Sequence, residues 1–163
     1  MTSRDSGKPV VGFVGLGNMG GVLASNLVRG GFEVVAHDTA GPAHTPTGAR
    51  WAPYPGEVAR ATDVVVLSLP DGAVCTQVVR ELAGVRERRA THVVDTSTVG
   101  VKAARYLAEL GLGYVDAPVS GGVAGARGRT LMVMYAGTDE DCARVEPVLA
   151  GLSDRRRRVG DRP

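Results

Sequence analysis

The stretch "PVVGFVGLGNMG" (residues 9–20) decides the fold class. Its opening residues are almost all apolar, which predicts a buried β-strand. Directly afterwards Met19, Leu23 and Leu27 recur at helical spacing, so residues 18–29 should form a helix with one face on a sheet. A strand that enters a helix through a glycine turn is typical of the first unit of an α/β fold.

The same alternation continues along the chain. We expect six strands, at residues 9–15, 32–38, 63–70, 91–95, 113–118 and 130–137. Further helices are expected at about residues 55–61, 71–83, 99–110 and 138–150. Residues 48–57 should be a loop or a short edge strand, and the glycine-rich residues 118–129 should not be regular throughout. The alternation predicts a doubly wound, mainly parallel α/β sheet of Rossmann type with right-handed crossovers.

Composition supports a single domain at residues 9–163 after a flexible lead at residues 1–8. The 163 residues include 23 glycines and are 44% hydrophobic but only 4% aromatic, as parallel sheets with tight turns often are. The net charge of +2 gives no long-range field for a polyanion. With no signal peptide or membrane span predicted and Cys75 and Cys142 interpreted as buried reduced thiols, we expect a soluble cytoplasmic protein.

The glycines of "GLGNMG" (15–20) have the GxGxxG spacing of a dinucleotide-binding turn. Gly15 permits the tight turn, Gly17 lets the backbone approach a pyrophosphate, and Gly20 lets helix and strand pack closely. Asp38 ends the second predicted strand and should accept hydrogen bonds from the adenosine ribose. Thr39 stands where a protein that binds a 2′-phosphate usually has arginine, so NAD is favoured and NADP stays an alternative.

Two other segments close predicted strands at the edge where ligands bind in open α/β sheets. They are "SLPDG" (68–72) and "DTSTVG" (95–100). Leu69 and Pro70 should press on a cofactor ring, and Ser97 or Thr98 should bond a carboxamide or substrate unless they serve only as helix caps. The expected cofactor-binding residues are Gly15, Leu16, Gly17, Asn18, Met19, Gly20, Asp38, Leu69, Pro70 and Thr98.

The chain resembles the cofactor-binding half of the β-hydroxyacid dehydrogenases, from about Val10 to Pro163. The segments "GFVGLGNMG", "DTSTV" and "DAPVSGGVAGARGRTLMVMYAG" (116–137) carry the resemblance. That family includes 3-hydroxyisobutyrate dehydrogenase, tartronate semialdehyde reductase and, more distantly, 6-phosphogluconate dehydrogenase. The resemblance implies reversible oxidation of a 3-hydroxy acid, such as 3-hydroxyisobutyrate or D-glycerate, to a semialdehyde or keto acid. It also implies that Thr98 contacts the nicotinamide side and that the substrate carboxylate is held by Ser120, Gly121 and Gly122.

The chain departs from the family at the catalytic position. Family members use a lysine in a GxGxxxK segment on a long helix that leads into an all-helical second domain, and neither occurs in this sequence. Its two lysines are Lys8, before the first strand, and Lys102, expected on a solvated helix surface. We therefore expect no catalytic residue in this chain, cofactor binding without turnover, and either a truncated product or half of a split enzyme. A homo-oligomer or a separate helical-domain partner would then complete it.

The segment "RRRRVGDRP" (155–163) resembles the strand and turn that precede the family's lysine helix. Its arginines are interpreted as a polar lead into an exposed edge strand. Two other hypotheses remain: a non-catalytic, dinucleotide-responsive interaction module, and, third, a nucleic-acid binder that uses these arginines. The three histidines are scattered, so no metal site is expected.

Overall fold

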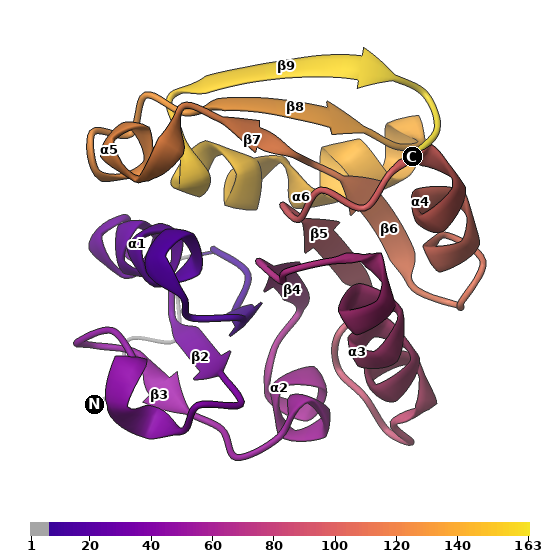
Figure 1. Ribbon diagram of the computed structural model, residues 1–163. Coiled ribbons are helices and arrows are strands. Elements are labelled where there is room, and N and C mark those ends of the chain that lie inside the picture. The colour runs from indigo at the N-terminus through magenta and orange to yellow at the C-terminus, as the bar shows by residue number, and fades with distance from the viewer. Residues whose placement is uncertain (1–6) are drawn as a thin grey trace.

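In the computed structural model, which describes residues 7–163, the apolar run after Pro9 forms the central strand β1 (Figure 1). Of the predicted flexible lead, residues 1–6 lie outside the described residues. The described chain contains nine strands: β1 Val11–Val14, β2 Val34–His37, β3 Arg50–Trp51, β4 Val64–Leu67, β5 His92–Asp95, β6 Gly113–Asp116, β7 Val119–Ser120, β8 Met132–Ala136 and β9 Arg155–Gly160. The helices are α1 Asn18–Arg29, α2 Pro55–Ala61, α3 Gly72–Gly84, α4 Val101–Leu107, α5 Gly122–Arg127 and α6 Asp139–Leu152, with a 3₁₀ turn, η1, at Pro42–His44.

All nine strands form one sheet in the order β3-β2-β1-β4-β5-β6-β8-β7, and β9 pairs with the other edge of β8. The pairs from β3 through β6 are parallel, β8 runs antiparallel to β6 and β7, and β9 is parallel to β8. The first six strands have the order of a dinucleotide-binding sheet, which reverses direction between β1 and β4. The predicted Rossmann-type, mainly parallel fold is therefore confirmed.

Two apolar cores lie on opposite faces of this sheet, because successive side chains of a strand point to opposite faces. On one face, α1, α5 and α6 pack against residues such as Phe13 and Val66. On the other, α2, α3 and α4 pack against Val65 and Leu67. Every residue of β1 and β4 is buried, which explains their unbroken apolar sequences. None of the helices over residues 7–163 has the length and apolarity that a membrane crossing requires.

The predicted elements need three corrections. Nine strands occur over residues 7–163: the six predicted ones, the short strands β7 and β9, and β3, which is the short edge strand that residues 48–57 were expected to allow. The predicted helix 99–110 is shortened to α4, since Gly100 at its start has φ +81° and Gly111 after its end has φ +96°. Residues 118–129 contain β7 and α5, as the expectation of partial regularity allowed. Helices α1 and α2 begin and end at the predicted residues.

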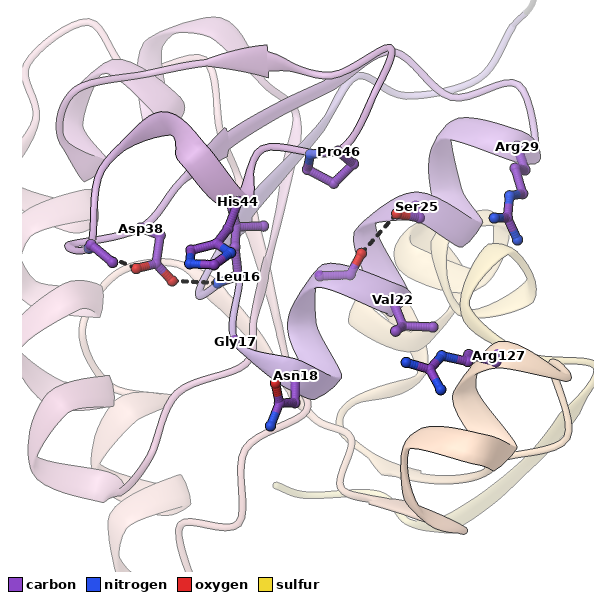
Figure 2. Close-up of a pocket in the computed structure, with 12 residues that line it drawn as sticks. Leu16, Gly17, Asn18, Val22, Ser25, Arg29, Asp38, His44, Pro46 and Arg127 are labelled. Carbon is purple, nitrogen blue, oxygen red and sulfur yellow. Dashed lines mark hydrogen bonds between the residues drawn. The ribbon is translucent and has the colours of Figure 1, made fainter.

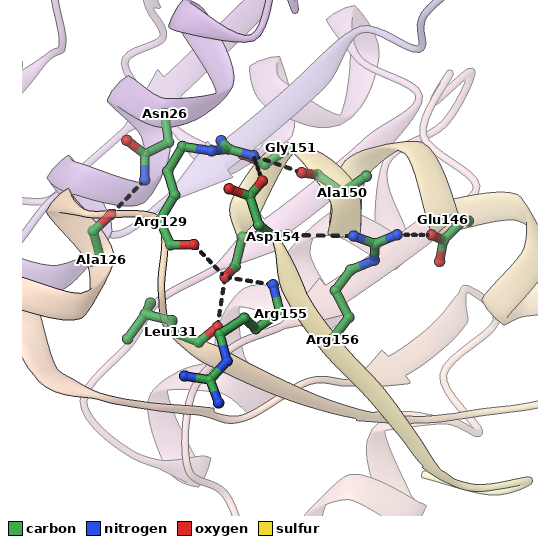
Figure 3. A network of polar contacts seen from close by, with 11 residues as sticks. Asn26, Ala126, Arg129, Leu131, Glu146, Ala150, Gly151, Asp154, Arg155 and Arg156 are labelled. Carbon is green, nitrogen blue, oxygen red and sulfur yellow. Dashed lines mark hydrogen bonds and ion pairs between the residues drawn. The ribbon is translucent and has the colours of Figure 1, made fainter.

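The third correction concerns the terminal arginines, which form β9 itself and are not a lead into it. Arg156 pairs with Glu146 at 2.6 Å (Figure 3). Arg158 pairs with Asp139 at 2.6 Å, so alternate side chains of β9 reach α6. Arg129 donates to the carbonyl oxygens of Ala150 and Gly151 at 2.9 and 2.8 Å. A guanidinium at this position satisfies the last carbonyl groups of α6 and complements its dipole. These contacts hold β9 and α6 together.

Candidate functional site

A cavity of about 650 Å³ opens at the carboxyl ends of β1, β2 and β4, where the strand order reverses. Eight of the ten predicted cofactor-binding residues line it: Gly15, Gly17, Asn18, Met19, Gly20, Asp38, Leu69 and Pro70. Thr39 after β2 also lines it, and α3 contributes Val74, Gln77 and Glu81. Most of the residues predicted to bind a cofactor therefore lie around one cavity, and the sequence analysis did not identify its α3 wall.

The three glycines of the turn have different spatial requirements. Gly15 has φ +101°, and a Cβ there would lie 2.0 Å from the Ser68 carbonyl oxygen. A Cβ on Gly20 would lie 1.9 Å from the Gly15 carbonyl oxygen. At Gly17, by contrast, a Cβ would meet no atom within 4 Å. Gly15 and Gly20 are therefore required by close packing, whereas Gly17 leaves space free at the amino end of α1.

Asp38 ties the turn to the end of β2. One carboxylate oxygen accepts a hydrogen bond from the Leu16 backbone N–H at 2.6 Å, and the other accepts one from the Ala40 N–H at 2.8 Å (Figure 2). Each oxygen of an ionised carboxylate has about two acceptor positions, so a hydroxyl donor can still bind to either. Asp38 thus holds the phosphate turn in place and keeps acceptor capacity facing the cavity.

A buried polar network joins the loops that follow β4 and β5. The Leu69 N–H donates to Ser97 Oγ at 2.8 Å, and the Ser97 N–H donates to Asp95 Oδ1 at 2.9 Å. The Tyr114 hydroxyl donates to Asp95 Oδ2 at 2.7 Å. Burial raises the pKa of Asp95, and hydrogen bonds from Ser97 and Tyr114 oppose that rise. Through the bond to Ser97, the network holds the backbone of Leu69, which lines the cavity, in place.

Sequence reasoning missed Asp95 as a structural centre of the site. Its signal was present in the spacing of "DTS" (95–97), because an aspartate often bonds the backbone two residues on. In the same network the Ser97 hydroxyl is buried and accepts the Leu69 N–H, and its predicted bond to a carboxamide or substrate stays a prediction. Burial first, and then the charge of Asp95, raises the pKa of the neighbouring Cys75 thiol to about 12. Cys75 and Cys142 are both free and buried, as predicted.

A family model for the NAD binding domain of 6-phosphogluconate dehydrogenase matches residues 10–160. The chain belongs to this family. It is 36% identical to 2-(hydroxymethyl)glutarate dehydrogenase of Eubacterium barkeri over 160 residues, which are 93% of the chain and 53% of that protein. The chain thus spans about half the length of the curated relatives it matches. The resemblance to hydroxy acid dehydrogenases inferred from the sequence is confirmed.

Solved structures agree with this membership. The domain superposes on Mycobacterium tuberculosis 3-hydroxyisobutyrate dehydrogenase, determined with L-serine, with a TM-score of 0.83 and 33% identity. That match covers 93% of this chain and 54% of the other. A second structure, Psf3 in complex with NADP⁺ and 2-OPP, has a TM-score of 0.76 and 27% identity, covering 93% of this chain and 57% of that one. NAD(P) binding is therefore the property that the family indicates, without a preference between the two.

Five residues named from the sequence lie outside the 650 Å³ cavity of this NAD-binding domain. Leu16 lines a second cavity of about 630 Å³ beside α1. Thr98 is exposed between β5 and α4, and it lines neither cavity. Ser120, Gly121 and Gly122 are exposed where β7 passes into α5. Their predicted roles toward nicotinamide and substrate stay predictions.

The remaining chemistry-bearing residues do not gather at this site. Lys102 is exposed on α4, and Lys8, which precedes β1, donates to the carbonyl oxygen of Gly30 at the C-terminal end of α1. Over residues 7–163, no group of three or more His, Cys, Asp or Glu side chains is placed to hold a metal ion. His92 is the first residue of β5 and pairs with Asp141 at 3.0 Å. The residues that line the cavity thus include neither of the two lysines.

Proposed function

We propose that this chain is the coenzyme-binding domain of an NAD(P)-dependent dehydrogenase of 3-hydroxy acids, such as 3-hydroxyisobutyrate or D-glycerate. The observation that carries the proposal is the free space at Gly17, where α1 begins at the wall of the 650 Å³ cavity. The first turn of a helix presents unpaired N–H groups and a partial positive charge. Phosphate groups are the ligands that such a helix end binds in dinucleotide-binding folds.

The residues present fit a dinucleotide along the cavity. The backbone of Gly17, Asn18 and Met19 would hold the pyrophosphate, and Asp38 would accept the adenosine ribose hydroxyls. Leu69 and Pro70 would cover the cofactor from the β4 side. When bound, NAD(P) supplies the hydride acceptor of the reaction. The protein's contribution from this domain is to bind and orient the cofactor.

The substrate carboxylate is proposed to bind at Ser120, Gly121 and Gly122. Gly121 and Gly122 have φ +132° and +68°, conformations that glycine adopts readily, and both residues are exposed. Because they have no side chains, nothing of their own obstructs the approach of an anion to their N–H groups. Convergent N–H groups of this kind bind anions. The resemblance of the segment 116–137 to the family's substrate-binding motif supports this assignment. By the same resemblance, Thr98 is proposed to contact the nicotinamide side of the cofactor.

We propose that the chain binds cofactor without turning over 3-hydroxy acids by itself. Removing the hydroxyl proton requires a positioned base. The two lysines of the sequence, Lys8 and Lys102, do not line the cofactor cavity. A partner of this domain, either a helical domain or another subunit, is proposed to supply the base and to complete the substrate pocket.

NAD is proposed to bind more tightly than NADP. Asp38 places a carboxylate at the ribose end of the cavity, and Thr39 beside it provides no positive charge. A 2′-phosphate near Asp38 meets like-charge repulsion, whereas a 2′-hydroxyl can donate to it.

Calorimetric titration of the purified chain with NAD and NADP tests the binding proposal, and the absorbance of NADH tests turnover. We expect saturable binding of NAD, weaker binding of NADP, and no NADH formation from 3-hydroxyisobutyrate or D-glycerate. Steady NADH formation by the chain alone would contradict the proposed division of labour. Absence of heat with either cofactor, from a chain shown to be folded by circular dichroism, would contradict the binding proposal.

A further inference from the structure

Asp95 is a fully buried carboxylate at the carboxyl end of β5. Its Oδ1 accepts the Ser97 N–H at 2.9 Å and a weaker bond from the Cys75 thiol at 3.8 Å, and its Oδ2 accepts the Tyr114 hydroxyl at 2.7 Å. Over residues 7–163, no lysine, arginine or histidine lies within ion-pair distance of this carboxylate. Buried carboxylates are normally paired with a cation, so Asp95 is an exception in this fold.

The bonding pattern of Asp95 suits its ionised form. A backbone N–H can only donate, so Oδ1 is an acceptor, and the Tyr114 hydroxyl supplies the proton of the bond to Oδ2. Burial raises the pKa of Asp95, and the bonds from Ser97 and Tyr114 oppose that rise. After burial itself, the charge of Asp95 is the cause that raises the pKa of Asp116 to about 6. The interior therefore contains a negative charge at neutral pH.

This charge lies directly behind a wall of the 650 Å³ cavity. Ser97, whose N–H bonds Asp95, accepts the Leu69 N–H at 2.8 Å with its hydroxyl oxygen. Two hydrogen bonds thus connect the carboxylate to Leu69, which lines the cavity beside Pro70. From the side of α3, the Cys75 thiol contacts Asp95, and the preceding residue of that helix lines the cavity as well.

We propose that Asp95 determines which redox form of the cofactor this domain prefers, by strengthening the binding of NAD(P)⁺ relative to NAD(P)H. This inference rests on the proposed function, in which Leu69 and Pro70 cover the cofactor and Thr98 contacts its nicotinamide side. The nicotinamide ring is positively charged when oxidised and neutral when reduced, whereas the rest of the cofactor is the same in both forms. A fixed negative charge behind the wall attracts the oxidised ring and leaves the reduced ring nearly unaffected.

The geometry makes this effect large enough to measure. Water screens a buried charge less than a surface charge, and no cation among residues 7–163 neutralises Asp95 at short range. For two charges about 10 Å apart, effective dielectric constants from about 80 down to about 20 correspond to factors of roughly two to fifteen in affinity. Because the cavity opens to solvent, we expect a factor of about five.

Asp95→Asn removes the charge and keeps the shape of the side chain. The asparagine carbonyl oxygen can accept the Ser97 N–H, and its amide can donate to the Tyr114 oxygen. The experiment measures NADH affinity of the purified chain by fluorescence titration, and NAD⁺ affinity by competition against bound NADH, at pH 7.5 and one fixed salt concentration. We expect Asp95→Asn to weaken NAD⁺ by about fivefold and to change NADH by less than about twofold.

Three further variants separate charge from structure. Ser97→Ala removes the acceptor of the Leu69 N–H and keeps the charge, so it should weaken NAD⁺ and NADH by similar factors. Asp63→Asn removes a carboxylate at the amino end of β4, where it pairs with Arg89, and is the matched control for charge. His92→Gln, at the amino end of β5, is the control for that strand. Neither control should change the ratio of the two affinities.

Asp116→Asn provides a second charge variant in case Asp95→Asn does not fold. Asp116 is the neighbour of Asp95 in the register of β5 and β6, and it is ionised at pH 7.5 because its pKa is about 6. Its removal should also weaken NAD⁺ more than NADH.

Several results would overturn the assignment. Equal weakening of NAD⁺ and NADH by Asp95→Asn would reduce Asp95 to a structural role, and so would affinities that do not change at all. If Asp95→Asn does not fold, an unchanged affinity ratio in Asp116→Asn would refute the inference. In each of these cases the wild-type chain still binds, so the proposed function stands. A folded wild-type chain that binds neither form would refute the proposed function and this inference with it.

Discussion

Gly17 offers the sharpest perturbation, because a side chain there changes the ligand site and leaves the fold intact. It is the N-cap of α1, with φ −67° and ψ −164°, which any residue can adopt. A Cβ meets no atom within 4 Å. Aspartate is among the best N-cap residues, so Gly17→Asp should stabilise the folded chain by a few tenths of a kcal/mol, up to about 1 kcal/mol. For a chain of this length that corresponds to a rise in Tm of about 1–4 °C.

The same substitution should abolish cofactor binding. The new carboxylate would accept the N–H groups at the start of α1 and would repel a pyrophosphate at close range. We expect the affinity of Gly17→Asp for NADH to fall by at least about a hundredfold, since losing these N–H groups and adding repulsion costs at least about 3 kcal/mol. Gly17→Asn has nearly the same shape without the charge, so it should weaken binding clearly less.

Gly20 provides the contrasting case. A Cβ there would lie 1.9 Å from the Gly15 carbonyl oxygen, so Gly20→Ala must displace backbone. Overpacking of this kind costs about 3 kcal/mol, or a fall in Tm of about 6–12 °C. Differential scanning fluorimetry and NADH fluorescence titration on the three variants separate the two effects. If Gly17→Asp bound NADH as the wild type does, or if Gly20→Ala kept the wild-type Tm, the reasoning about this turn would be refuted.

Three further predictions follow from buried and paired groups. Burial alone would raise the pKa of Asp63, but hydrogen bonds from Arg89 and the Val10 N–H lower it below 3.8 overall. The ionised Asp63 carboxylate therefore stabilises the fold above that pH, and Asp63→Asn should lower the free energy of unfolding by about 1–2 kcal/mol at neutral pH, measured by urea unfolding. This difference from the wild type should be lost as the pH falls through the lowered pKa. Burial, and then the charge of Asp95, raises the pKa of Asp116 from 3.8 to about 6. The favourable contribution of protonated Asp116 to stability is thus complete below pH 3.8 and is lost as the pH rises through about 6. Asp116→Asn should therefore be more stable than the wild type by about 1–3 kcal/mol at pH 7.5 and equally stable in acid. Equal stabilities of the two proteins at both pH values would contradict this account. Cys75, with a pKa of about 12, should resist a disulfide exchange reagent at pH 8 in the folded chain and react on unfolding, whereas rapid reaction of the native chain would show that the thiol is accessible.

Local signals predicted the helices and the glycine turn well. Helix α1 has its apolar face at Met19, Leu23 and Leu27 and is followed by Gly30, so both ends are marked in the sequence. Helix α2 begins at Pro55, whose fixed φ suits the first helical position. These features depend on residues close together along the chain, and the structure agrees with them to the residue.

Strand β9 shows why local patterns do not predict every element, since only the family resemblance indicated a strand in this segment. Four consecutive arginines have low strand propensity, and pairing with β8 and ion pairs to Glu146 and Asp139 of α6 stabilise them as a strand. Those partners are distant in sequence, so no local pattern indicates them. Two of the four arginines are thereby occupied within the fold, which leaves fewer of them for the nucleic-acid hypothesis.

The candidate site was predictable only where its residues lie close together along the chain. The GxGxxG spacing and Asp38 indicated the phosphate turn and its carboxylate. The sequence did not indicate that Ser97 turns inward to hold Leu69, because that bond joins residues 28 positions apart. Nor did it indicate the second cavity, which arises where the 3₁₀ turn and α5 flank α1. Tertiary contacts decide both features.

The most direct test of the central claim is a fluorescence titration of the folded wild-type chain with NADH. The account predicts saturable binding at one site, which is lost in Gly17→Asp and retained in His92→Gln. A folded wild-type chain whose signal does not saturate with NADH, or whose binding persists in Gly17→Asp, would contradict the claim that the amino end of α1 holds the cofactor's phosphates.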